Sequence, residues 1–399
     1  MTETQNNQHE VGGTAIASAP SGAPAGGNRS WREAPDAFLD GLPRPVKLGL
    51  MAVLVVFLYL LPLLNPPIVV TPGSDFAAVL FTVAAYVLVA LGLNVVLGYA
   101  GLLDLGYVGF FAVGAYTVAV FGSLHGKLPF LLLLPLAVIL STVSGLILGA
   151  PTLRVRGDYL AIVTLGFGEI IRLTAVNSGW LGAAAGISNV PRPPSVEIAT
   201  IPRLSWDGPV AVIDLDDTTT LLKFGVLDQV PYYWLALTVI LVILLADKML
   251  QNSRVGRAWE ATREDEDAAE LMGVPTFRFK LLAFAIGAFV GGLSGALFAT
   301  KQGFINPESF PLLLSILFLA AVVVGGPGNR WGVILGAIVV AYLPERFRGF
   351  SEYRVLVFGL LLLLLANYRP SGLIPPRRSI RAKQADDRLH ALEEGAARA

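Results

Sequence analysis

The stretch SRVGRAWEATREDEDAAELMGV, from Ser253 to Val274, is a long polar segment between two strongly apolar runs. The flanking runs, Tyr232 to Asp247 and Phe277 to Thr300, are long enough to cross a bilayer. The polar stretch is therefore expected to emerge on one face of a membrane. Its pattern predicts a short surface helix, with acidic residues in its first part and Gly273 ending it.

The end of this stretch resembles a loop of the membrane subunits of ABC importers. It reads Asp267-Ala268-Ala269, then three residues, then Gly273, which matches Glu-Ala-Ala-x-x-x-Gly with aspartate in place of glutamate. The small alanines would let a partner approach closely, so this helix is expected to enter a groove on a separate ATPase. The alternative is a solvated loop between two membrane helices.

Composition places the chain among polytopic membrane proteins. Hydrophobic residues make up 54% and charged residues 15% of the sequence, and the mean hydropathy is +0.66. The formal net charge is zero, so no overall basic field suggests a nucleic-acid partner. The absence of cysteine excludes disulfides, thiolate nucleophiles and cysteine-ligated metals.

The apolar runs predict an all-α integral membrane protein with about ten transmembrane helices, the ninth of them short. Long apolar runs without alternation favour helices over a barrel. The predicted spans are Val46 to Leu64, Phe76 to Gly98, Leu102 to Gly122, Pro129 to Ala150, Tyr159 to Trp180, Tyr232 to Asp247, Phe277 to Thr300, Phe310 to Gly325, Gly332 to Tyr342 and Tyr353 to Asn367.

The same reading divides the chain into three regions. Residues 1–36 are predicted to be a disordered tail, 37–375 a transmembrane permease domain, and 376–399 a basic cytoplasmic tail. Within the middle region, 181–230 is expected to be an extracytoplasmic loop and 253–274 a cytoplasmic segment.

The distribution of charge predicts that both termini are cytoplasmic. The acidic loop Leu181 to Val230 then lies on the opposite face. One loop departs from this charge pattern, because Arg346, Arg348 and Arg354 would lie on the extracytoplasmic face. Either the ninth run enters the membrane without crossing it, or Glu345 and Glu352 offset these arginines. The basic residues placed inside are Arg29, Arg32, Arg44, Lys47, Arg154, Arg156, Arg254, Arg257, Arg263, Arg369, Arg377, Arg378, Arg381 and Lys383.

Two glycine-rich regions are expected where helices pack closely or break. Gly287, Gly291 and Gly295 share one helix face and allow another backbone to approach. The stretch Gly98 to Gly114 holds Asp104 near a span end, and a broken helix there would line either a solute pathway or a tight packing seam.

Four polar residues at membrane depth are candidates for the pathway. Glu169 and Arg172 lie three apart on one helix face and are expected to form an ion pair, either structural or in contact with solute. Asp104 could equally be an end-of-span residue that faces water. Asn94 is expected to bond across helices, as packing or as a solute contact.

The residue inventory argues against an enzyme. The histidines are His9, His125 and His390, all outside the spans, so no buried Ser-His pair or histidine metal site forms within them. No phosphate-binding Gly-x-x-x-x-Gly-Lys-[Ser/Thr] motif is present, so any ATP is bound by another chain. The sequence therefore predicts no catalytic residue, no metal and no cofactor.

Several long motifs, in one order, resemble the LivM-type permease subunits of high-affinity branched-chain amino-acid ABC importers. The resemblance extends from about Ala90 to Pro375, without the tails and much of Leu181 to Val230. The motifs are GDYLAIVTLGFGEI from Gly157, then GRAWEATREDEDAAELMG, KQGFINPESF, VVVGGPGNRWG and NYRPSGLIP.

The resemblance implies a bacterial inner-membrane importer with four kinds of partner: a second homologous permease, two cytoplasmic ATPase subunits, an extracytoplasmic binding protein and a small amino acid. It implies that Glu260 to Gly273 docks on an ATPase. The charged contacts would be Glu260, Arg263, Glu264, Asp265 and Asp267, with Ala268, Ala269 and Gly273 giving shape.

Two alternatives remain open at this point. Related permeases carry urea and other small polar solutes, and this chain has Leu181-Gly182-Ala183-Ala184-Ala185-Gly186-Ile187 where relatives tend to have Thr-Gly-Gly-x-x-Gly-Ile. A stand-alone ion-coupled transporter would instead use Glu169 as a proton or ion site. The polar stretch Ser253 to Val274 argues against a stand-alone transporter.

Overall fold

The computed structural model describes residues 43–66, 75–153, 155, 158–196, 200–207, 210–220, 222–225, 228–346 and, further on, 356, 359, 360, 363, 367 and 372–374. Residues 1–57 and 58–399 form two separate units. Both predicted tails, Arg154, Arg156 and most of the predicted tenth span lie outside the described residues.

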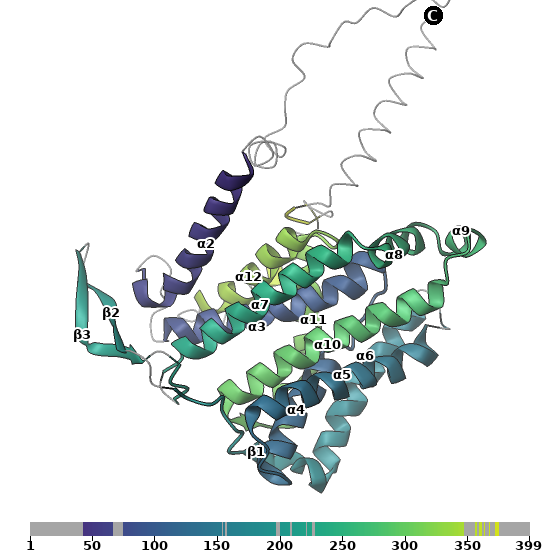
Figure 1. The fold of residues 1–399 in the computed structure, drawn as a ribbon. Helices are drawn as coiled ribbons and strands as arrows, with labels where there is room; N and C mark the ends of the chain where they lie inside the picture. Colours follow the sequence, from purple (N-terminus) through teal and green to yellow (C-terminus); the bar gives the residue numbers. More distant parts are fainter. Residues whose placement is uncertain are drawn as a thin grey trace, which may run out of the picture. The chain divides into compact units, whose positions relative to one another are not determined.

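The described chain is helical, with four short strands (Figure 1). The α-helices are α2 Arg44–Leu64, α3 Phe76–Leu93, α4 Val108–Ala119, α5 Phe130–Thr152, α6 Asp158–Asn177, α7 Val230–Gln251, α8 Arg254–Glu264, α9 Glu266–Leu271, α10 Thr276–Gln302, α11 Leu312–Gly325 and α12 Arg330–Arg346. Two π-helical segments, η1 Asn94–Tyr99 and η2 Val120–Leu124, continue α3 and α4. The short 3₁₀ turns are η3 Gly179–Leu181, η4 Ala183–Ala185 and η5 Pro307–Ser309.

Seven described helical segments are long and apolar enough to cross a membrane. In α2 the apolar part, Gly49–Leu64, is shorter, and α12 has 17 residues. The prediction of a helical, multi-pass membrane protein is thus confirmed, whereas the count of about ten spans is not confirmed for the part of the chain that the structure describes. The seven segments are Phe76–Tyr99, Tyr107–Leu124, Phe130–Thr152, Tyr159–Asn177, Val230–Gln251, Thr276–Gln302 and Pro307–Gly325.

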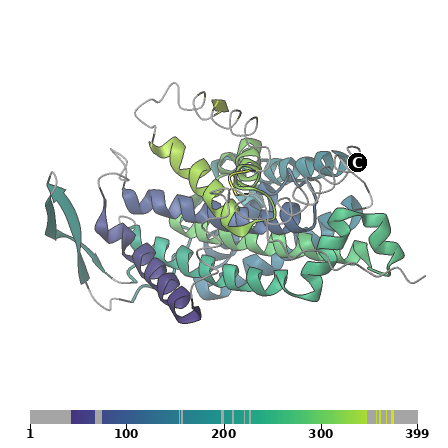
Figure 2. The same cartoon turned by 90° about the horizontal axis from the view of Figure 1, so that it is seen from above.

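Helix α10 lies at the centre and packs against α3, α4 and α5, and Figure 2 shows the long helices running alongside one another. Its glycines allow this close packing, because Gly291 faces the ring of Tyr107 and the Cβ of Phe110, and a Cβ at Gly295 would collide with the backbone oxygen of Phe111. The predicted close packing at the glycines of this helix is confirmed. The buried aromatic side chains around it fix α4 against α10.

Between η1 and α4 the backbone is not helical, although the sequence reads as one apolar span from Leu102 to Gly122. Residues within neighbouring spans hold this segment: Thr164 Oγ1 of α6 accepts from Leu105 N (3.1 Å), and Ser315 Oγ of α11 donates to Leu105 O (2.6 Å). Tyr107 donates to Gly287 O near the middle of α10 (2.7 Å). The predicted broken helix therefore lies inside the bundle, where protein groups satisfy its backbone.

The last turns of α2 pair with α7 through polar contacts on an otherwise apolar surface. Tyr233 donates to Leu58 O (3.0 Å), and Trp234 Nε1 donates to Tyr59 O (2.8 Å). The hydroxyls of Tyr59 and Thr238 also share a hydrogen bond (2.7 Å). These contacts fix the end of α2 to the first half of α7.

The strands lie in the regions that the sequence assigned to loops. Strand β1 Ile187–Ser188, in the predicted extracytoplasmic loop, pairs antiparallel with β4 Phe304–Ile305, which follows α10. In the same predicted loop, β2 Thr200–Asp207 pairs antiparallel with β3 Val210–Thr220. Near β1, the rings of His125 and Trp180 stack at 4.9 Å. The pairing of β1 with β4 joins the loop after α6 to the end of α10.

Candidate functional site

The polar stretch from Ser253 to Val274 forms two helices, not the single helix that the sequence predicted. Asp265 has an extended backbone between α8 and α9 (φ −154°, ψ 110°) and caps α9, because its Oδ1 accepts from Ala268 N (3.0 Å). Ser253 caps α8 by accepting from Val255 N and Gly256 N. An aspartate at this position competes with helix continuation, and this explains the break.

Helix α8 has one face buried against the bundle. Trp259 is fully buried and Thr262, three residues on, is nearly so. The indole Nε1 of Trp259 donates to Phe279 O of α10 (2.6 Å). Burying an indole with its N–H satisfied anchors α8 firmly to α10.

Helix α9 is fixed to the start of α10 by an ion pair and a hydrogen bond, and it is closed by a glycine cap. Lys280 Nζ lies 2.5 Å from Glu266 Oε2, and Thr276 Oγ1 donates to Glu270 Oε1 (2.5 Å). At its end, Val274 N donates to Ala269 O (3.0 Å) and Gly273 N to Glu270 O (2.9 Å). Gly273 has φ +85°. This is the glycine-ended helix that the sequence predicted, closed by a Schellman motif.

Two large apolar side chains project from the end of α9. Leu271 is 89% exposed and Met272 is 85% exposed, and Figure 1 shows α8 and α9 together at one end of the helices, with β1 at the other. Sequence reasoning missed both residues as contacts, although they lie directly before the predicted terminal glycine. Exposed apolar side chains on an otherwise polar segment are typical of a docking surface.

The structure separates the predicted docking residues into two groups. Glu264, Asp265, Asp267, Ala268 and Gly273 are exposed and Glu260 is half-buried, whereas Ala269 is buried beneath α9. Arg263 is exposed as well, and its Nη1 donates to the backbone oxygen of Gly98 in η1. Ala269 and the Arg263 guanidinium therefore contact this chain itself.

The contact between Arg263 and Gly98 belongs to a cluster that reaches into the bundle. The Arg263 guanidinium also lies beside Gly328, and Gly328 N donates to Asn94 Oδ1, at the start of η1 (2.8 Å). Asn94 is fully buried, and its Nδ2 has no hydrogen-bond partner among the described residues. The predicted bond of Asn94 across helices is confirmed, with the loop before α12 as its partner.

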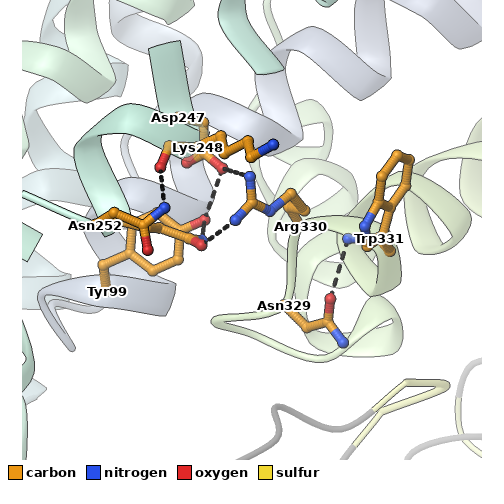
Figure 3. A network of polar contacts seen from close by, with 8 residues as sticks. Tyr99, Asp247, Lys248, Asn252, Asn329, Arg330 and Trp331 are labelled. Carbon is orange, nitrogen blue, oxygen red and sulfur yellow. Dashed lines mark hydrogen bonds and ion pairs between the residues drawn. The ribbon is translucent and has the colours of Figure 1, made fainter. Parts of the chain in front are cut away.

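A second cluster joins the ends of η1, α7 and α12 (Figure 3). Tyr99 donates to Asp247 Oδ2 (3.1 Å), and Arg330 Nη1 lies 3.7 Å from the same oxygen. Gln251 completes it, since its Nε2 donates to the Tyr99 hydroxyl and its Oε1 accepts from Arg330 Nη2. Because Asp247 is nearly buried, this pairing stabilises a charge that would be costly alone.

The motifs at the end of the chain meet beside these clusters. Leu373 N donates to Val324 O (2.7 Å) and Ile374 N to Gly325 O (3.1 Å). Asn329 connects both parts, because its Oδ1 accepts from Trp331 N (Figure 3) and its Nδ2 donates to Ile374 O. The segment 372–374 thus covers the end of α11.

The other three predicted pathway residues lie outside these two clusters. Asp104 is fully buried in the broken segment, not at a water-facing end of a span; its Oδ1 accepts from Gly106 N (2.9 Å), and its Oδ2 has no partner among the described residues. Glu169 and Arg172 form the predicted ion pair (2.5 Å) on an outer face of α6. Among the described residues, no group of three acidic or histidine side chains is placed to hold a metal.

Comparison with known proteins gives consistent results over most of the chain. Residues 76–366 match the family described as branched-chain amino acid transport system / permease component. The chain is similar to the high-affinity branched-chain amino acid transport system permease protein LivM of Salmonella typhimurium, with 41% identity over 87% of this chain and 80% of that protein. The Escherichia coli protein of the same name is also 41% identical, over 85% of this chain and 77% of its own length.

More distant similarity reaches a second kind of permease. The chain is 30% identical, over 34% of its length and 44% of the relative, to the permease protein LivH of the same kind of system in Salmonella typhimurium. No solved structure shows a significant match to the chain.

Proposed function

Because the chain belongs to the family of permease components of branched-chain amino acid transport systems, we propose that it pairs with a homologous permease and that two ATPase subunits drive them. The chain is a multi-pass transport subunit, and similarity to LivH indicates a system with a second permease. ATP hydrolysis is assigned to separate chains. A binding protein on the opposite face would deliver the amino acid. The membrane is the bacterial inner membrane, with both termini cytoplasmic.

The observation that carries the ATPase assignment is the segment α8–α9 with its apolar end. The segment is anchored to α10 through Trp259 and Lys280, while Leu271 and Met272 are presented outward. A rigidly held helix with an exposed apolar end is suited to a groove on a soluble partner. The partner would therefore be an ATPase subunit that contacts this end on the cytoplasmic face.

Coupling requires that the ATPase states interact unequally with this segment, since otherwise nucleotide could not shift the conformation of the permease. The chain offers a physical connection for such a shift. Arg263 joins α8 to η1, and η1 leads directly into the broken segment that carries Asp104. In this proposal, movement of α8 changes the conformation of η1. Such a role suits η1, because π-helical segments are frequently found at functional sites.

The proposal is tested by purifying the tagged chain from its own membranes in mild detergent, identifying its partners and reconstituting the assembly. We expect a second permease and ATPase subunits to copurify, and ATP and binding protein to drive uptake of leucine, isoleucine and valine. Urea uptake in place of leucine uptake would contradict the proposal that the solute is a branched-chain amino acid. Recovery of the chain alone, with gradient-driven uptake abolished by Glu169→Gln, would establish a stand-alone ion-coupled transporter.

A further inference from the structure

Helix α6 presents an outer face that this chain leaves uncovered within the described residues. Its apolar side chains recur at helical spacing and are exposed, Tyr159 by 70%, Ile162 by 64% and Ile170 by 62%. The ion pair interrupts this stripe, with Arg172 29% and Glu169 36% exposed. A wholly apolar stripe would be suited to contact with lipid. The two charged side chains within it therefore need another explanation.

Charged side chains on a lipid-facing helix surface are costly, so they are almost always found facing the interior of an assembly or water. Glu169 and Arg172 lie within the membrane-crossing segment Tyr159–Asn177, with Arg172 five residues before its end. This face of α6 is therefore expected to border the aqueous pathway between the two permeases.

An open hollow of about 420 Å³ lies at these charges. Glu169, Arg172, Glu308, Pro311 and Leu312 line it. The cleft thus combines one cationic group, two acidic groups and apolar side chains. Glu308 belongs to η5, at the start of α11, so two separate parts of the chain contribute the charges.

The guanidinium keeps donors available to a ligand. Arg172 binds Glu169 through Nε (3.1 and 3.0 Å) and Nη2 (2.5 Å). Its Nη1 has no hydrogen-bond partner among the described residues, although a guanidinium carries five N–H donors. The Glu308 carboxylate, which lines the same cleft, is exposed.

We propose that this cleft binds the zwitterionic backbone of the transported amino acid, with the solute carboxylate on Arg172 and the solute ammonium on Glu308. The apolar surface of Pro311 and Leu312 would then contact the aliphatic side chain of the solute. Glu169 holds the guanidinium in place, so it acts as a positioning residue. This assignment rests on the proposed function and adds to it the residues that recognise the solute.

The test measures uptake by the complete reconstituted importer, with ATP and saturating loaded binding protein. Arg172→Ala and Glu308→Gln are each expected to lower the maximal uptake rate about tenfold, as expected for loss of a charge-assisted hydrogen bond. Hydrolysis of ATP stimulated by the binding protein should persist in both variants. Ile170→Ala, on the same exposed face, is the matched control and should transport normally.

The double variant Glu169→Gln with Arg172→Gln separates solute binding from a structural ion pair. If the pair only stabilised the fold, removing both charges would leave no unpaired charge, and uptake would return to the wild-type rate. We expect the double variant to remain as defective as Arg172→Ala. Wild-type uptake by the double variant or by Glu308→Gln would overturn the site while leaving leucine transport by the wild-type importer, and hence the proposed function, intact.

Discussion

Replacing both Leu271 and Met272 with aspartate is expected to reduce ATP-driven amino acid uptake to background and to release the ATPase subunits from the permease. The two side chains are 89% and 85% exposed in the isolated chain. Burying two such side chains contributes about 4 kcal/mol, which corresponds to about a thousandfold in affinity. The aspartates would also have to be desolvated in the ATPase groove. Copurification of the ATPases and uptake by membrane vesicles measure the effect.

The matched control exchanges the two residues, Leu271→Met with Met272→Leu, so that apolar area is retained. This variant should keep its ATPases and transport at close to the wild-type rate. The aspartate variant should still insert into the membrane, because neither side chain is part of the packed bundle. Normal uptake by the aspartate variant would show that the end of α9 is not part of the docking surface.

Arg263→Ala is expected to leave the ATPases bound but to uncouple hydrolysis from transport. The substitution removes the hydrogen bond from α8 to Gly98 O without altering the exposed end of α9. Coupling free energies between sites are about 1–3 kcal/mol, so we expect about a tenfold lower ratio of amino acid transported to ATP hydrolysed. Simultaneous measurement of uptake and phosphate release in proteoliposomes gives this ratio.

Arg257→Ala is the matched control, since Arg257 lies on the same helix and its guanidinium donates to the nearby backbone oxygen of Asn252 (3.4 Å). Its ratio should equal that of the wild type. If Arg263→Ala also gave the wild-type ratio, the connection from α8 to η1 would not carry the coupling. Loss of the ATPases from Arg263→Ala would instead make Arg263 a docking residue, as the sequence alone suggested.

The features that could be predicted from the sequence are those set by local chemistry. Apolar length predicted the membrane helices, and the spacing of Glu169 and Arg172 on one helix face predicted their ion pair. Gly273 was expected to end a helix because a glycine accepts positive φ without strain, and it does so at +85°. Each of these depends on residues close together in the chain.

The features that were missed depend on residues far apart in the sequence. The charge of Arg263 placed it among the predicted ATPase contacts, but its hydrogen bond to Gly98, which lies 165 residues away, could not be foreseen. The glycine-rich stretch Gly98 to Gly114 suggested a broken helix, but not that the side chains of Thr164 and Ser315 satisfy its backbone. No local pattern specifies such partners.

The central claim is that the end of α9 contacts an ATPase, and site-directed cross-linking tests it most directly. The chain contains no cysteine, so Met272→Cys introduces a unique thiol for a thiol-reactive photo-cross-linker in native membranes. Leu313→Cys, 60% exposed on α11, is the control on the bundle surface. We expect the probe at 272, and not at 313, to yield an adduct with an ATPase subunit. An importer that remains active and gives no ATPase adduct from position 272 would contradict the account.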